Sequence, residues 1–125
     1  MRSGVNMTRS PRRGDIVRLR LDPVEGAEQG GDRPGLVISP DIINRHNPVV
    51  LIAAITSKKT EKVYPHEALI EPSEAGLPKR SKVMLMQMRG LDKQRIIGYY
   101  GAVDAPTLAR VDAALRIATG LTRLS

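Results

Sequence analysis

The feature that most constrains the fold is a continuous apolar run at residues 49–55. It has the length of a strand, and it is bounded by Pro48 on one side and by Thr56 and Ser57 on the other. An apolar run without alternation is typical of a strand that is buried on both faces. We therefore expect residues 49–55 to form the centre of the core.

Shorter strands are predicted on either side of this run. Apolar and polar residues alternate in 15–21, and 35–39 is short, apolar and β-branched. Pro65 and Pro72 flank a strand at 66–71 and place it at a sheet edge. Two more strands are expected at 82–89 and 96–103. The turn-rich stretch 40–48 predicts a connection with one helical turn.

The segment 82–89 predicts a two-sided strand. Strict alternation places Val83, Leu85, Gln87 and Arg89 on one face, and a row of three methionines on the other. Methionines spaced in this way indicate adaptable packing, in the core or in an interface between subunits.

The chain ends in a predicted amphipathic helix. Asp104 is a good N-cap, Pro106 falls in the first turn where proline is tolerated, and Gly120 can end the helix. One apolar stripe lies between them, formed by Leu108, Val111, Leu115 and Ala118. Short antiparallel strands followed by one helix predict a mainly β (α+β) fold, a small, partly open antiparallel barrel with a C-terminal α-helix.

Length and composition predict one domain and an anionic partner. At 125 residues the chain divides into a flexible basic N-terminal arm, residues 1–12, and a domain, residues 13–125. The net charge of +7 favours nucleic acid or an acidic protein segment, although a basic surface without any partner is the alternative. The absence of cysteine, of a secretion signal and of a 20-residue apolar run predicts a cytoplasmic protein that does not enter a membrane.

A glycine-punctuated polar segment, 23–34, presents one arginine, Arg33, before the second strand. Pro34 restricts Arg33 to extended conformations, and the planar guanidinium suits a phosphate. The hydroxyls of Thr56 and Ser57 emerge where the buried strand ends, so both ends can meet at one cleft.

No metal-binding constellation is present, so we expect neither a metal nor another cofactor. His46 and His66 could form an acid–base pair, but their turn and strand-edge contexts favour surface roles.

Several linked segments resemble the MazF/PemK family of toxin endoribonucleases. In order they are RGDIV (13–17), GAEQGGDRPGLVI (26–38), AAITS (53–57), QMR (87–89) and LDKQR (91–95). The resemblance implies an SH3-like, CcdB-like barrel that acts as a homodimer. It further implies a sequence-specific, metal-independent toxin that cleaves single-stranded RNA, including mRNA, and is inhibited by a cognate, acidic antitoxin.

The resemblance also implies the site residues. The catalytic pair falls on Arg33 and Thr56. The residues expected to bind RNA are Glu28, Gln29, Gly31, Ser57, Gln87 and Arg89. The family often has Gly-Ser-Glu where this chain has Gly-Ala-Glu at 26–28, so the contact from that serine hydroxyl cannot form here.

The implied reaction is attack by the ribose 2′-hydroxyl on its own phosphate, which leaves a 2′,3′-cyclic phosphate and a 5′-hydroxyl. Two alternatives stay open at this point. The chain could be a non-catalytic toxin that binds DNA gyrase, as the related CcdB toxins do, or a plain RNA-binding barrel.

Overall fold

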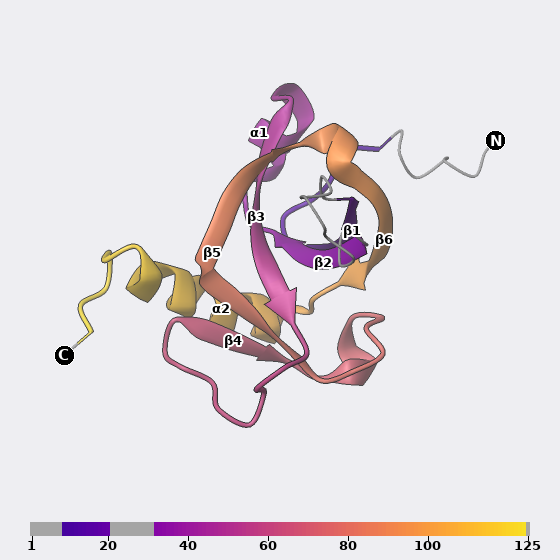
Figure 1. Ribbon diagram of the computed structural model, residues 1–125. Coiled ribbons are helices and arrows are strands. Elements are labelled where there is room, and N and C mark those ends of the chain that lie inside the picture. The colour runs from indigo at the N-terminus through magenta and orange to yellow at the C-terminus, as the bar shows by residue number, and fades with distance from the viewer. Residues whose placement is uncertain (1–8, 21–31, 125) are drawn as a thin grey trace, which may run out of the picture.

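The computed structural model describes residues 9–20 and 32–124 (Figure 1). The strands, α-helices and 3-10 helices (η) of these residues follow in the order β1 (Asp15–Arg20), β2 (Asp32–Val37), α1 (Asp41–His46), β3 (Val49–Thr56), β4 (Glu67–Ile70), η2 (Pro72–Glu74), β5 (Ser81–Asp92), η3 (Lys93–Arg95), β6 (Ile96–Ala102) and α2 (Ala105–Ala118).

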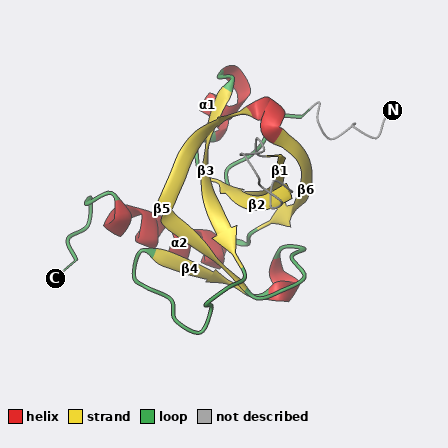
Figure 2. Ribbon diagram, viewed as in Figure 1, coloured by secondary structure: helices red, strands yellow, loops and turns green. Residues whose placement is uncertain are grey.

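The strands form one antiparallel sheet in the order β4-β5-β3-β2-β1-β6. The sheet curls strongly around its own axis, and α2 packs beside β4 and β5 (Figure 2). Because β4 and β6 are the two edges, the curled sheet stays open between them. The predicted class, a partly open antiparallel barrel with a C-terminal helix, is confirmed.

The sheet buries apolar residues on both faces. Neighbouring residues of one strand point to opposite faces, and Ile16 and Val17 of β1 belong to different buried clusters. The cluster that contains Ile16 packs under α2, through Val111 and Ala114. The other cluster is enclosed by the curl of the sheet and contains Val17, Leu19, Val37, Val50, Ile52, Leu91 and Ile96.

Helix α2 forms as predicted. The Asp104 side chain accepts a hydrogen bond from the Thr107 backbone N–H at 2.9 Å, which caps the first turn. The predicted stripe faces the sheet: Val111 is fully buried, and Leu108, Leu115 and Ala118 pack against the core. No helix in the described part of the chain is long and apolar enough to cross a membrane.

The central strand, β3, is less buried than the sequence predicted. β3 matches the apolar run, and Ile52, Ala53 and Ile55 are buried, but Val49 is 42% exposed and Leu51 39% exposed. These two residues share one face of β3 with Ala53 and Ile55, but unlike those two they are not part of the buried cluster under α2. Burial on both faces therefore holds only for the second half of the strand.

Strand β2 begins three residues earlier than predicted, at Asp32 rather than Gly35. Arg33 pairs with Leu19 and Pro34 with Arg18, so both are strand residues rather than loop residues. Pairing of β2 with β3 starts only at Gly35, opposite Ala54. Pro34 is paired with β1 but has no partner in β3. Its missing N–H therefore does not interrupt the ladder between β2 and β3.

The alternation predicted for 82–89 is broken within β5. Ala53 pairs with Met88 whereas Ala54 pairs with Met84, so residues 85–87 bulge out of the ladder. The bulge reverses the faces beyond it, because Met88 packs against the core with Val83 and Leu85. The predicted row of three methionines on one face was therefore wrong.

The described residues of the predicted N-terminal arm, 9–12, pack on the domain. Arg9 pairs with Asp15 at 3.1 Å and stacks over the Tyr99 ring at 4.2 Å, and Pro11 is buried. Residues 1–8, the remainder of that prediction, lie outside the described residues.

Candidate active site

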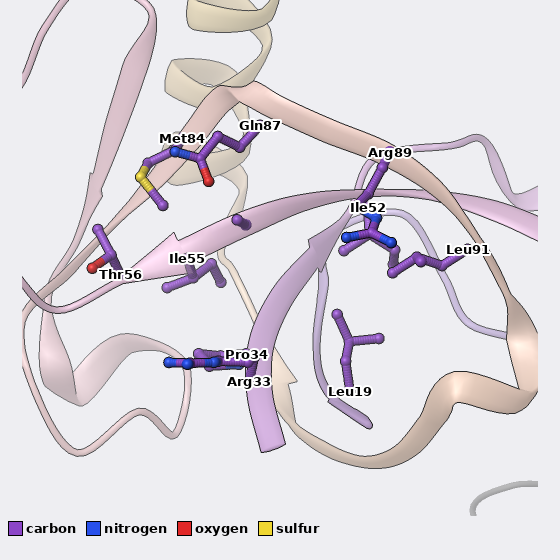
Figure 3. Close-up of a pocket in the computed structure, with 11 residues that line it drawn as sticks. Leu19, Arg33, Pro34, Ile52, Ile55, Thr56, Met84, Gln87, Arg89 and Leu91 are labelled. Carbon is purple, nitrogen blue, oxygen red and sulfur yellow. The ribbon is translucent and has the colours of Figure 1, made fainter. Parts of the chain in front are cut away.

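A cleft of about 310 Å³ opens where β2, β3 and β5 meet (Figure 3). Its floor is apolar, and polar groups reach it from three strands. The lining residues are Leu19, Arg33, Pro34, Ile52, Ala54, Ile55, Thr56, Met84, Gln87, Arg89 and Leu91. Four residues of the predicted site, Arg33, Thr56, Gln87 and Arg89, are therefore brought together here.

Arg33 is the second residue of β2, and its exposed side chain lines the cleft. Its backbone is fixed on one side by the pairing with Leu19 and on the other by Pro34. The preceding Asp32 is held by Arg18 at 2.8 Å. Figure 3 shows the guanidinium extending from the strand toward the side of the cleft where Thr56 lies. A planar donor fork so placed suits an anionic ligand.

Thr56 is the last residue of β3, and its hydroxyl is oriented by the turn that follows. Thr56 Oγ1 accepts a hydrogen bond from the Lys58 backbone N–H at 3.1 Å. Lys59 has φ of 56°, the left-handed conformation that non-glycine residues rarely adopt. Since a hydroxyl has one proton and two lone pairs, Thr56 can still donate a hydrogen bond to a ligand.

A second cleft, of about 250 Å³, lies against the first. Both clefts are lined by Arg33, Pro34, Ile55 and Thr56. The second adds Ser57, Lys58, Leu77, Pro78, Lys79, Ser81 and Tyr100. Arg33 and Thr56 thus stand between two hollows, which suits a chain-like ligand that passes over them.

The β5 bulge places Gln87 and Arg89 at the first cleft. Val83 before the bulge, Leu85 at its first position and Met88 after it all face the core, so the bulge resets the alternation. Gln87 and Arg89 are exposed, and Figure 3 shows Arg89 pointing down toward β2. Ser57 lines the second cleft only. Glu28, Gln29 and Gly31 lie outside the described residues.

The charge of the two clefts is uniformly positive. Their described lining residues include Arg33, Arg89, Lys58 and Lys79 and no carboxylate. A concave surface lined by one sign of charge attracts ligands of the opposite sign. The geometry and the electrostatics together suit a polyanion.

Sequence reasoning missed the far wall of the second cleft. Tyr100, Lys79 and Ser81 come from β6, the β4–β5 connection and β5, and no spacing in the sequence relates them to Arg33. Only Lys79, beside Pro78 in a turn, carried a signal of exposure.

The histidines do not form an acid–base pair. His46 ends α1 and His66 precedes β4, and Figure 1 shows these two elements at opposite ends of the molecule. Neither histidine lines the two clefts. Within residues 9–20 and 32–124, no group of three or more His, Asp or Glu side chains is placed to hold a metal ion.

Known proteins resemble this chain in both sequence and fold. The family of PemK-like, MazF-like toxins of type II toxin-antitoxin systems matches residues 12–119. Endoribonuclease EndoA of Bacillus subtilis (strain 168) is 39% identical over 110 residues, which are 88% of this chain and 95% of that protein.

Among solved structures, a chain of MazE-MazF (Form-II) from Deinococcus radiodurans superposes with a TM-score of 0.75 at 30% identity, covering 91% of this chain and 99% of that chain. An endoribonuclease from a mycobacterial species, solved in complex with its cognate antitoxin, superposes with a TM-score of 0.74 at 25% identity, covering 92% of this chain and all (100%) of its own. The family match spans nearly the whole described domain, including both clefts. This chain belongs to the PemK-like, MazF-like toxins of type II toxin-antitoxin systems.

Proposed function

We propose that the chain is a sequence-specific endoribonuclease toxin that cleaves single-stranded RNA, mRNA included, without a metal ion. The observation that carries the proposal is that Arg33 and Thr56 border both clefts. A phosphodiester bound by this pair has one neighbouring nucleotide in each hollow. The arrangement suits cleavage within a chain rather than at its end.

Cleavage at this site starts from the 2′-hydroxyl of the ribose whose 3′-oxygen carries the scissile phosphate. Its oxygen bonds to phosphorus as its proton leaves, and the bond to the 5′-oxygen of the next nucleotide breaks as that oxygen takes up a proton. The products are a 2′,3′-cyclic phosphate and a 5′-hydroxyl. The nucleic acid supplies its own nucleophile, so the protein must supply charge stabilisation and proton transfer.

Arg33 and Thr56 divide this work. The Arg33 guanidinium stabilises the additional negative charge on the phosphorane, and it takes part in moving the proton. Because a guanidinium is a poor proton acceptor, Arg33 contributes more as a hydrogen-bond donor than as a base. The Thr56 hydroxyl donates to a phosphate oxygen. Gln87, Arg89 and Ser57 contact the nucleotides on either side, as do Glu28, Gln29 and Gly31 of the β1–β2 connection.

The partners follow from the same surface. An acidic, disordered segment of a cognate antitoxin would fold onto the positive clefts and exclude RNA. Related chains have been solved as MazE-MazF and in complex with a cognate antitoxin, which supports an antitoxin as the partner. We further propose that the toxin acts as a cytoplasmic homodimer.

The deciding experiment is cleavage of a mixed-sequence RNA in the presence of EDTA, with mapping of the new 5′ ends. The wild type is expected to cut at defined sites and to spare DNA of the same sequence, which lacks the 2′-hydroxyl. Arg33→Ala and Thr56→Ala should abolish cutting while the protein stays folded. Binding without cleavage by the wild type would indicate the plain RNA-binding barrel. Inhibition of gyrase without RNA cleavage would indicate a CcdB-like activity.

A further inference from the structure

The face of the sheet that carries Thr56 continues across β5 and β4. Thr56 pairs directly with Lys82, and Glu67 pairs directly with Met84 two residues further along β5. Directly paired residues of an antiparallel ladder project from the same face, as do residues two apart in one strand. Thr56, Lys82 and Glu67 therefore project from one face.

Lys82 and Glu67 form a buried ion pair on this face. Lys82 Nζ lies 2.9 Å from Glu67 Oε1, and the two side chains are only 7% and 11% exposed. The β3–β4 loop covers them, because Lys82 Nζ also donates to the Lys62 carbonyl at 2.9 Å and the Tyr64 N–H donates to Glu67 Oε1 at 3.1 Å. The ion pair thus anchors the end of the loop that begins at Thr56.

The anchored end of the loop presents two stacked rings. The rings of Tyr64 and His66 lie 5.5 Å apart, centroid to centroid, with 14° between their planes. The chain contains only three tyrosines and neither Phe nor Trp, so aromatic rings are scarce. One of these few rings, that of Tyr64, is nevertheless 45% exposed rather than placed in the core. Lys82 Nζ also lies 5.9 Å from the Tyr64 ring centroid, so the ammonium of the ion pair helps to hold this ring in place.

Cations line the path from Thr56 to these rings. Lys58, Lys59 and Lys62 are all exposed on the loop, and Lys62 Nζ lies 5.1 Å from the Tyr64 ring centroid. Figure 1 shows this loop projecting below β4, beyond the body of the sheet. Basic side chains that follow a backbone, together with rings on which bases stack, are the combination that holds single strands.

We infer that the Tyr64–His66 stack is a base-binding platform for the RNA strand as it leaves the catalytic pair along the β3–β4 loop. A base extends the ring stack, and Lys58, Lys59 and Lys62 bind the phosphates between that base and the scissile bond. The inference rests on the proposed RNA-cleaving function, and it adds a contact outside both clefts. Stacking accepts any base, so this platform contributes affinity for longer strands rather than sequence choice.

The test measures binding in an Arg33→Ala background, where the RNA stays intact, with single-stranded RNAs of about five and about fifteen nucleotides that share one cleavage site. Tyr64→Ala should weaken binding of the longer RNA roughly 5- to 150-fold and leave the shorter RNA unaffected. Tyr64→Phe, which keeps the ring, should restore the affinity. Because stacking involves no counterion, the salt dependence of binding should be unchanged in Tyr64→Ala.

A base analogue gives a direct readout. A series of longer RNAs would each carry 2-aminopurine at a different position. At one position its fluorescence should be quenched when the Arg33→Ala protein binds, and this quenching should be lost in the Arg33→Ala/Tyr64→Ala protein. Thermal unfolding of both variants separates loss of stacking from loss of fold. If the folded Tyr64→Ala protein bound the longer RNA as tightly as the protein that keeps Tyr64, the inference would be overturned. RNA cleavage by the wild type would still support the proposed function in that case. Weaker inhibition by an antitoxin, with RNA affinity unchanged, would assign the rings to a peptide instead.

Discussion

Thr56 Oγ1 accepts the backbone N–H of Lys58 at 3.1 Å, so the hydroxyl proposed to bind the phosphate also closes the turn that begins the basic loop. One side chain therefore couples the active site to the loop. Thr56→Ser keeps both hydrogen-bonding roles, whereas Thr56→Val keeps the shape and loses both.

We expect Thr56→Ser to retain most of the cleavage rate and Thr56→Val to lose about 10²- to 10³-fold, the usual cost of removing one donor to a transition state. Single-turnover cleavage with saturating enzyme measures this directly. Equal rates for the two variants would show that the hydroxyl takes no part in the reaction.

Arg33→Lys tests whether charge alone suffices at the end of β2. Lysine keeps the positive charge but loses the planar donor fork, so we expect RNA binding close to that of the wild type and a cleavage rate about 10²-fold lower. Filter binding at low temperature and single-turnover rates separate the two effects. A rate near that of the wild type would reduce the role of Arg33 to attraction of the phosphate.

The basic loop should contribute through counterion release. Substitution of Lys58, Lys59 or Lys62 by Gln is expected to lower the slope of log affinity against log salt by about 0.7 for each phosphate that is no longer neutralised. The measurement is a salt titration of binding in the Arg33→Ala background. Arg116→Gln, in the last turn of α2 and away from both clefts, serves as the matched control and should leave the slope unchanged.

Gly35 occupies the closest approach of β2 to its neighbours. A Cβ at this position would lie 2.5 Å from Ile52 Cγ2 and 2.9 Å from Leu19 Cδ1, and both side chains are buried. Gly35→Ala should lower the free energy of unfolding by about 1–3 kcal/mol, the usual cost of overpacking, as measured by urea denaturation.

The same change should reduce cleavage, since Leu19 and Ile52 line the cleft beneath Arg33. Gly90→Ala is the control. Its Cβ would meet only Val49 Cγ1 at 3.0 Å, and Val49 is 42% exposed and free to move. A similar loss of stability in both variants would contradict this account of Gly35.

The Lys82–Glu67 pair should make stability dependent on pH. Burial acts to raise the pKa of Glu67, but the hydrogen bond from the Tyr64 N–H and the Lys82 ammonium outweigh it, so the pKa lies below its ordinary value. A folded-state pKa below the unfolded one means that the ionised carboxylate stabilises the fold above the unfolded pKa. This contribution is lost as pH falls through the folded pKa.

The free energy of unfolding of the wild type should therefore exceed that of Glu67→Gln at neutral pH, and the difference should shrink below about pH 4.3. Removing one partner leaves the other as a buried charge without its counter-charge. Lys82→Met alone should therefore lower the free energy of unfolding by about 3 kcal/mol, which is more than the loss in the Glu67→Gln/Lys82→Met double variant. Urea denaturation at several pH values measures both effects. A difference that does not vary with pH would contradict the titration of Glu67.

Local chemistry made the strands and the final helix predictable. The apolar run of β3, the prolines around β4 and the Asp104 cap of α2 each act within a few residues, and each appears where expected. Arg33 and Thr56 were also brought to one cleft, because each directly flanks an apolar strand segment.

Features that depend on pairing partners were not predictable. The bulge at 85–87 arises from the register of β5 against β3, and the methionines at 84, 86 and 88 recur at every second residue without a sign of it. The strand character of Arg33 and Pro34 comes from pairing with β1. Tyr100 reaches the second cleft only because β6 closes the curl beside β1.

The bulge in β5 also separates two kinds of evolutionary pressure along a single strand. Val83, Leu85 and Met88 are constrained by packing, whereas Gln87 and Arg89 face only solvent and the cleft. Substitutions at these two positions cost little folding free energy, because neither side chain packs in the core. Under the RNA contacts proposed for Gln87 and Arg89, changes at these two positions would alter which RNA is bound while the barrel itself stays the same.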